Sequence, residues 1–238
     1  MKGVKPLRQM VRVSCLMSLI LVVGTEITSG DDRLFPGSTD LSITRVQYEG
    51  GGDWYSNPTS IPNILANIAE RTGLPISQEL KTVKLSDPSL SDHPYLYMTG
   101  HGNVSFSDQD RNALRSHLVS GAFLHADDNY GLDESFRREI ELVFPENDLI
   151  EIPIDHPIFH MMYDLPEGLP KIHEHDGDAP QGFGIFYEGR LVVFYSFESD
   201  LGDGWENSEI HNDSADIREA AIQMGVNLYL YVLSQIIS

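Results

Sequence analysis

The chain has 238 residues, of which 41% are hydrophobic, and its formal net charge at pH 7 is −20. This length suffices for one large domain or two small ones and for a sizeable core without crosslinks. The excess of acidic residues makes nucleic acids and anionic lipids poor partners, because phosphate groups carry the same sign of charge. Divalent cations, small molecules and sugars remain compatible, and solubility alone would also account for the charge.

The N-terminal segment has the pattern of an export signal. Basic residues without any acid precede an apolar run over residues 13–23, which is too short for a bilayer span of roughly 20 residues. This pattern predicts a secretory signal over residues 1–30 and a periplasmic or extracellular protein without stable membrane insertion after cleavage. The alternative is an uncleaved N-terminal anchor. The single cysteine, Cys15, lies inside this segment, so residues 31–238 contain no cysteine nucleophile, thiolate ligand or disulfide.

The first half of the remaining chain alternates strands and helices. Residues 41–48 alternate apolar and polar side chains and predict a strand, and apolar residues at helical spacing predict a helix that begins near Thr59 and ends at Gly73. Short apolar runs at 83–85 and 95–99 predict two further strands.

The next elements follow the same alternation. Ser107 and Asp110 resemble a capping box and predict a helix that ends at Gly121. A strand over residues 122–126 and a helix over residues 134–144 come next.

The last third of the chain differs in character. Residues 155–182 are rich in Pro, His, Gly and acid and predict a long irregular loop, a type of segment that is often functional. Residues 184–187 and 191–197 predict a hairpin, and a mostly apolar helix extends over about 216–236. The complete order predicts a single α/β domain over residues 31–238. Its sheet is mostly parallel, is flanked by helices on both faces, and has one antiparallel edge hairpin.

Four of the predicted strands end in polar, glycine-marked loops: GGGDWYSNP, GHGN, DDNYG and ESDLGDGWE. In an open α/β sheet, ligands bind outside the carboxyl ends of the strands. We therefore expect one site there. Its candidate catalytic residues are His101, Asp128 and Glu198, and its candidate ligand-binding residues are Gly51, Gly52, Asp53, Trp54, Tyr130, Asp176, Asp200 and Trp205. The alternative is that Gly and Asp mark ordinary turns.

A divalent metal is the first chemistry that these residues suggest. His173 and His175 alternate in an extended segment, so both imidazoles can face one ion. With His101 and Asp127 they form a candidate set of ligands for zinc or manganese. Calcium is the weaker alternative, with oxygen ligands from Asp200, Asp203 and Glu206 or from residues 127–129.

Carboxylate catalysis is the second chemistry, as in sugar hydrolysis, although the spacing singles out no pair. Trp54, Tyr130 and Trp205 are candidates for stacking on a sugar ring, and core packing is the alternative for these side chains. No G-x-S-x-G and no phosphate-binding glycine motif is present.

Several long stretches resemble a bacterial family known as domain of unknown function 4159. They span roughly residues 41–235 and include YEGGGDWYSNPTSIPNIL, PYLYMTGHGNVSFSDQD, GAFLHADDNYGLDESFRRE and QGFGIFYEGRLVVFYSFESDLGDGWEN. The resemblance implies a flavodoxin-like fold related to class I glutamine amidotransferases. Those enzymes use a cysteine nucleophile, and the loop GHGN contains none, so glutaminase activity is not implied.

Two functions are therefore expected at the same edge of the sheet. The first is an exported hydrolase that uses a metal or carboxylates. The second is a non-catalytic module that binds a sugar or a partner in the cell envelope.

Overall fold

The computed structural model describes residues 41–173 and 177–237, which lie within one compact unit spanning Gly37–Ser238. The predicted signal over residues 1–30 and two predicted site residues, His175 and Asp176, lie outside the described residues. The described part contains a seven-stranded sheet in the order β2-β1-β3-β4-β7-β6-β5. Its strands are β1 (Ile43–Gln47), β2 (Lys81–Lys84), β3 (Tyr95–Met98), β4 (Phe123–Asp127), β5 (Ile150–Glu151), β6 (Gln181–Tyr187) and β7 (Arg190–Phe197).

Five neighbouring strands of the sheet are parallel, and the remaining two form an antiparallel edge. β2, β1, β3, β4 and β7 run in the same direction, whereas β6 runs against β7 and β5 against β6. The predicted α/β class and the mostly parallel sheet are confirmed, and the β6–β7 hairpin is the predicted edge. β5 was not predicted, because two exposed residues carry no detectable alternation.

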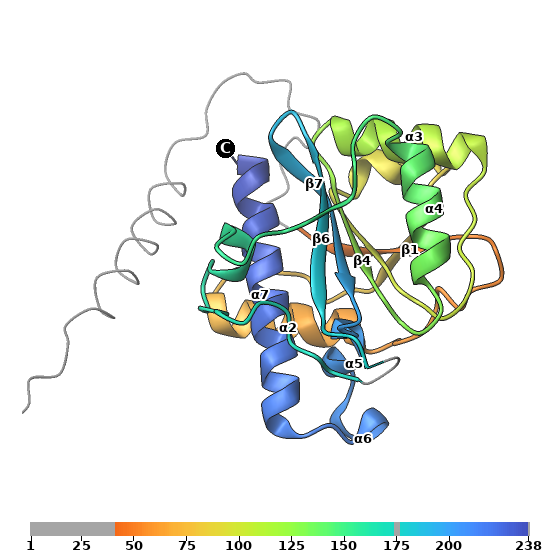
Figure 1. The fold of residues 1–238 in the computed structure, drawn as a ribbon. Helices are drawn as coiled ribbons and strands as arrows, with labels where there is room; N and C mark the ends of the chain where they lie inside the picture. Colours follow the sequence, from red (N-terminus) through yellow and green to blue (C-terminus); the bar gives the residue numbers. More distant parts are fainter. Residues whose placement is uncertain (1–40, 174–176, 238) are drawn as a thin grey trace, which may run out of the picture. The chain divides into compact units, whose positions relative to one another are not determined.

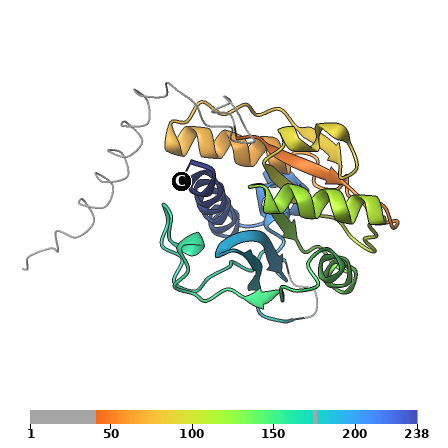
Figure 2. The ribbon, with the colours of Figure 1, turned by 90° about the horizontal axis from the view of Figure 1, so that it is seen from above.

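Helices cover both faces of the sheet (Figures 1 and 2). They are α2 (Ser60–Thr72), α3 (Asp108–Val119), α4 (Asp133–Val143), α5 (Leu201–Trp205), α6 (Ser208–His211) and α7 (Ala215–Ile237), with short turns η1 (Pro88–Asp92) and η2 (Pro157–Phe159). α2 and α7 lie against one face, and α3 and α4 against the other (Figure 2). Within the described ranges, no helix has both the length and the apolarity needed to cross a membrane.

Local sequence rules explain where two of these helices begin and end. The hydroxyl of Ser107 accepts a hydrogen bond from the backbone of Asp110, whose carboxylate accepts one from the backbone of Ser107, both at 3.1 Å. This is the predicted capping box, with Asp in place of Glu. α2 ends at Gly73, whose φ of +74° is a left-handed conformation that glycine adopts without strain.

The larger part of the core lies between the sheet and the α2–α7 layer. α2 contributes Ile61, Ile64, Leu65 and Ile68, all fully buried, at the predicted helical spacing. Met224 and Leu228 of α7 meet them, and Tyr95 and Tyr97 come from the sheet. Full burial of each large apolar side chain stabilises the fold by about 1.5–3 kcal/mol, so this layer fixes α7 against the sheet.

The parallel strands bring four loops to one edge of the sheet. The backbone N–H of Asp53 donates to the carbonyl of His101 (3.1 Å), and that of Gly102 donates to Tyr130 (3.4 Å). The N–H of Asp128 donates to Ser196 at the end of β7 (3.3 Å). These bonds link the loops after β1, β3, β4 and β7 in sequence along the carboxyl edge.

A close approach of α5 to α7 generates a first prediction. A Cβ at Gly204 would lie 2.4 Å from the Cβ of Ala221. We expect Gly204→Ala to lower the free energy of unfolding by about 1–2 kcal/mol, because overpacking outweighs the gain in helix propensity. Urea denaturation measures the change.

Ala221→Gly is the matched control, because it removes the atom that the new methyl group would meet. The double variant should lose less stability than the sum of the two single losses, by about 0.5 kcal/mol or more. Strictly additive losses would contradict the proposed contact.

Candidate functional site

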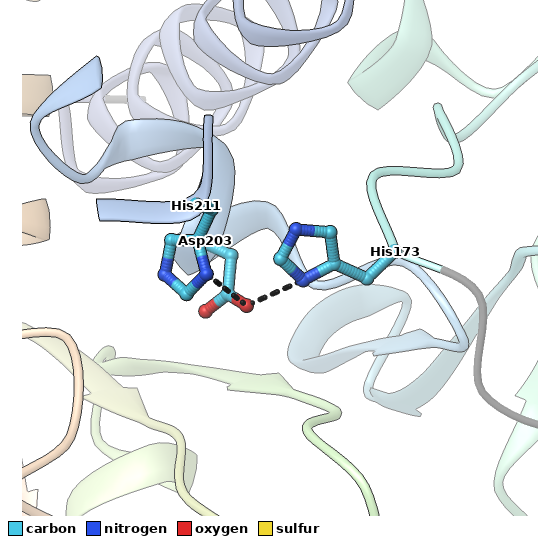
Figure 3. Close-up of side chains that lie close together, drawn as sticks. All are labelled: His173, Asp203 and His211. Carbon is cyan, nitrogen blue, oxygen red and sulfur yellow. Dashed lines mark ion pairs between the residues drawn. The ribbon is translucent and has the colours of Figure 1, made fainter. Parts of the chain in front are cut away.

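Two histidines and an aspartate meet at the carboxyl edge of the sheet (Figure 3). His173 lies in the long segment before β6, Asp203 in α5, and His211 ends α6. Asp203 Oδ2 lies 2.7 Å from His173 Nδ1 and 3.7 Å from His211 Nδ1. One potential ligand atom from each residue lies within 4.8 Å of the others, and among the described residues no other group of three His, Cys, Asp or Glu is as close.

Asp203 is held in place by its surroundings. Its side chain is only 8% exposed, and its Oδ1 accepts a hydrogen bond of 2.6 Å from the amide of Asn57, in the loop after β1. Burial alone would raise the pKa of Asp203, but the hydrogen bond from His173 and the nearby His211 outweigh it and lower this pKa below its usual value. The carboxylate is therefore charged at neutral pH.

A second carboxylate supports His173 from the other side of its ring. Asp213 Oδ1 lies 3.2 Å from His173 Nε2. Metal-binding histidines usually donate their second ring N–H to a carboxylate, which fixes the tautomer and leaves the first nitrogen free to bind the ion. His211 Nε2 is shielded from solvent and has no hydrogen-bond partner within residues 41–173 and 177–237.

The chemistry of these three residues fits a divalent transition metal. Two imidazoles and a carboxylate are typical ligands of catalytic zinc sites, which leave the fourth position open to water or substrate. Tetrahedral bonds of about 2 Å place ligand atoms about 3.3 Å apart. The two separations from Asp203, 2.7 and 3.7 Å, bracket that value, and the ligand atoms of the two histidines lie within 4.8 Å of each other. Both histidine side chains remain 26% exposed, which leaves access from solvent.

Buried acids continue the site toward the end of β4. Asp127 accepts hydrogen bonds from the hydroxyls of Ser196 (2.6 Å) and Tyr97 (2.9 Å) and from the backbone N–H groups of Leu201 (3.1 Å) and Gly202 (2.6 Å). Burial raises its pKa to about 6 in spite of these bonds. Asp127 thus fixes the start of α5 to the end of the sheet.

Two more acids share this buried region. Burial raises the pKa of Asp128 to about 7, although a hydrogen bond from the backbone N–H of Glu198 acts in the opposite direction. Burial and the charges of Asp127 and Asp203 raise the pKa of Asp200 to about 10. Glu198 and Asp200 both have left-handed backbone conformations, with φ of +55° and +57°. Glu198 forms an ion pair with Lys171.

The backbone of Gly202 lies between this acidic region and the cluster of His173, Asp203 and His211. A Cβ at this position would lie 2.9 Å from the Asn57 amide nitrogen and 3.1 Å from Asp127 Oδ2. Asn57 also holds Asp203. The predicted residues Asp127 and Asp200 and the cluster at Asp203 are therefore parts of one continuous polar region.

His101 belongs to a different pair, in the loops after β1 and β3. Its Nδ1 lies 3.1 Å from Asp53 Oδ2, and the other Asp53 oxygen accepts a hydrogen bond from the backbone N–H of His101. The His101 side chain is 53% exposed. Gly100 permits this arrangement with a φ of +134°, and a Cβ there would lie 2.9 Å from the carbonyl of Asp53. The predicted ligand-binding residues Gly51 and Gly52 lie in the same pair of loops.

The three aromatic candidates occupy different environments. Trp205 is 2% exposed and donates its indole N–H to the carbonyl of Ala221 at 2.8 Å. This burial favours core packing, the alternative given for this side chain, over stacking on a ligand. Tyr130 is 58% exposed, and Trp54 is half-buried.

The structure thus brings the predicted metal residues together differently from the expectation. His173 is in the metal-type cluster, but with Asp203 and His211, whereas His101 and Asp127 have other partners. Sequence reasoning missed His211 as a member of the cluster, Asn57 and Asp213 as its supports, and the hydrogen bonds of Glu206. The Glu206 carboxylate accepts hydrogen bonds from the backbone of Thr59 and Ser60 and caps the start of α2. No motif spacing signals any of these four residues.

The fold and the cluster together define an α/β protein with a polar site at the carboxyl edge of a mostly parallel sheet. A family model described as a domain of unknown function (DUF4159) matches residues 42–233, and the chain belongs to this family. The membership indicated by the sequence motifs is thereby confirmed. A comparison with curated proteins gave no match.

The raised pKa of Asp128 gives a second prediction. Because this pKa is about 7 in the folded protein and 3.8 ordinarily, the folded state binds more protons than the unfolded chain between these values. Stability from this group is present below pH 4 and is lost as the pH rises toward 7. We expect Asp128→Asn to raise the free energy of unfolding by about 2 kcal/mol at pH 8 and to change it little at pH 4.

Urea denaturation at both pH values checks this expectation. The exposed Asp92→Asn variant serves as the control and should behave alike at the two pH values. An equal effect of Asp128→Asn at pH 4 and pH 8 would show that ionisation of Asp128 does not destabilise the fold.

Proposed function

We propose that this protein is a metal-dependent hydrolase whose divalent ion, zinc or manganese, is bound by His173, Asp203 and His211. The observation that carries the proposal is the three-residue cluster with Asp213 behind His173. Two imidazoles, one carboxylate and a supporting carboxylate form the usual ligand pattern of an ion that keeps an open coordination position. The exposure of both histidines supports access for water and substrate.

Each residue of the chain has a distinct role in this proposal. When bound, the ion supplies a Lewis acid and lowers the pKa of a water molecule. Asp203 neutralises part of the ion's charge, and Asp213 fixes the tautomer of His173. In the ion-free protein, burial and the neighbouring carboxylates raise the pKa of Asp200 to about 10, so this side chain is neutral at pH 7.

A purely structural network is the competing explanation. In the absence of an ion, the hydrogen bond to Asp203 raises the pKa of His173, and Asp213 contributes as well. A protonated His173 between two carboxylates would hold α5 to the segment before β6 as an ion-pair network. Metal content distinguishes the two explanations directly, because the network requires no ion.

We also propose a flavodoxin-like relation and export. The parallel strands follow the order β2-β1-β3-β4-β7, which corresponds to the 2-1-3-4-5 order of flavodoxin-like sheets, and the motifs that resemble amidotransferase-like proteins agree with it. The basic start and short apolar run of residues 1–23 support export.

A third prediction concerns metal content. We expect the purified protein, dialysed against zinc or manganese, to retain about one equivalent of one of these ions by elemental mass spectrometry. His173→Ala with His211→Ala should abolish retention, because two of three protein ligands are removed. His160→Ala is the matched control, since His160 pairs with Asp164 and not with the cluster. Absence of retained metal in the parent protein would refute the proposal.

A fourth prediction concerns Asp213. Asp213→Asn should weaken metal binding about 10- to 100-fold without removing a ligand, because the amide holds the His173 ring less firmly. Competition with a chromophoric chelator measures the dissociation constant. An unchanged constant would mean that Asp213 does not support the ion.

Hydrolysis itself is tested with a panel of chromogenic esters, phosphate esters and glycosides. The metal-loaded parent should cleave at least one class, and the double histidine variant should not. If the protein binds metal but cleaves no class of substrate, it is a metal-binding protein and the proposed hydrolase activity is refuted.

A further inference from the structure

A hollow of about 400 Å³ opens between α2, α6 and the start of α7. A second hollow, of about 80 Å³, lies elsewhere, beside Tyr48 and Lys84. A volume of this size is within the range of small-molecule sites. Its walls come from segments far apart in the sequence, around Asn63, Asn207 and Arg218, so the fold as a whole creates it.

The floor of the hollow is apolar. Ile64 and Trp205 lie beneath it with only 0% and 2% of their surfaces exposed, and the half-buried Ile222 of α7 provides its accessible apolar atoms. This floor suits the C–H face of a small ring, which needs contact with apolar atoms and offers no hydrogen bonds.

The rim carries side-chain amide groups that form some hydrogen bonds and have further hydrogen-bonding atoms without a partner in the described residues. The Asn63 amide nitrogen donates to the carbonyl of Trp205 and to the side-chain oxygen of Asn207, both at 3.0 Å. The amide nitrogen of Asn67 donates to the backbone of Asn63 at 2.9 Å. These bonds set the orientation of each amide, and they leave acceptors on Asn63 and Asn67 and a donor on Asn207 without a partner within the described ranges.

The charged groups at the rim balance each other. Arg218 donates to the backbone carbonyl of Glu206 and has no ion-pair partner in the described part of the chain. Glu209, on α6, accepts only a weak bond from Ser208, at 3.4 Å, among the residues that the structure describes. One cation and one anion give the rim no net charge, and the net charge of −20 of the chain disfavours anionic ligands further.

We infer that this hollow binds a neutral polyhydroxylated ligand, a mono- or disaccharide. Hydroxyl groups both donate and accept, so they can use the unpaired amide acceptors, the amide donor and the Arg218 and Glu209 side chains together. An aliphatic ligand would leave these groups unpaired, and a phosphate would meet Glu209 and the acidic surface. This inference is independent of the proposed metal site, because none of the three metal-type residues lines the hollow.

The test is a binding screen with the full chain, followed by calorimetry. The first panel contains glucose, galactose, mannose, N-acetylglucosamine and their β-linked disaccharides, with glycine, glutamate and inorganic phosphate as members of other classes. We expect at least one sugar to bind and the other classes not to bind. Binding of the other classes alone, or of no compound, would overturn the inference.

Two variants locate the site. Ala66→Phe fills the hollow with bulk, and Asn67→Ala removes a rim amide. Each should lower the affinity for the selected sugar at least tenfold while circular dichroism and the Tm remain near those of the parent. Glu70→Gln, on the same helix but outside the hollow, is the control and should bind as the parent does. Sugar binding that survives both Ala66→Phe and Asn67→Ala would place the ligand elsewhere and refute the assignment. If Ala66→Phe fails to fold, Asn67→Ala decides the question alone.

Discussion

The carboxylate of Asp127 joins the sheet to the segment that carries the site. It accepts hydrogen bonds from the β3 residue Tyr97 and the β7 residue Ser196 and, at the same time, from the first two backbone N–H groups of α5. α5 has five residues, too few to be stable as an isolated helix. The position of Asp203 therefore depends on this side chain at the end of β4, together with the hydrogen bond from Asn57.

This arrangement places several carboxylates in a buried region, where their charged forms are destabilised. Asp127, Asp128 and Asp200 are buried, and each has a raised pKa because burial disfavours the charged form. Asp203, in the same region, instead has a lowered pKa, because it is in contact with two histidines. The region thus holds one firmly ionised carboxylate among acids that are more easily protonated. Such separation of pKa values within one cleft is typical of functional sites, although ion-pair networks show it too.

Much of the fold follows from patterns that act over short distances. Strand alternation, the apolar face of α2 and the Ser107–Asp110 capping box each involve residues within a few positions, so they are visible in the sequence. The alternation of strands and helices then gives the α/β class and the edge where the loops meet. The short helix α5 was read as a polar loop, because LGDGW contains two glycines and only five residues.

The candidate site was harder to predict for a related reason. His173 and His211 are 38 positions apart, and they meet only because α5 and α6 fold back beside the segment before β6. That return depends on the bonds to Asp127 and Asn57, which are contacts between distant parts of the chain. Similarly, the sequence around Trp205 is compatible with both ligand stacking and core packing, and only the contact with α7 shows that this side chain is buried.

Glu206 follows Asp203 by three residues, and its carboxylate accepts the N–H groups of Thr59 and Ser60 at the start of α2. The first turn of a major core helix is therefore satisfied by a residue of the site segment, because Thr59 itself provides no side-chain cap. When α5 opens, the N–H groups at the start of α2 lose the Glu206 carboxylate, and α5 at the same time loses its own hydrogen bonds to Asp127. We therefore expect amide protons at the start of α2 and in α5 to exchange through one cooperative opening with a shared free energy, even though about 140 residues of chain separate them.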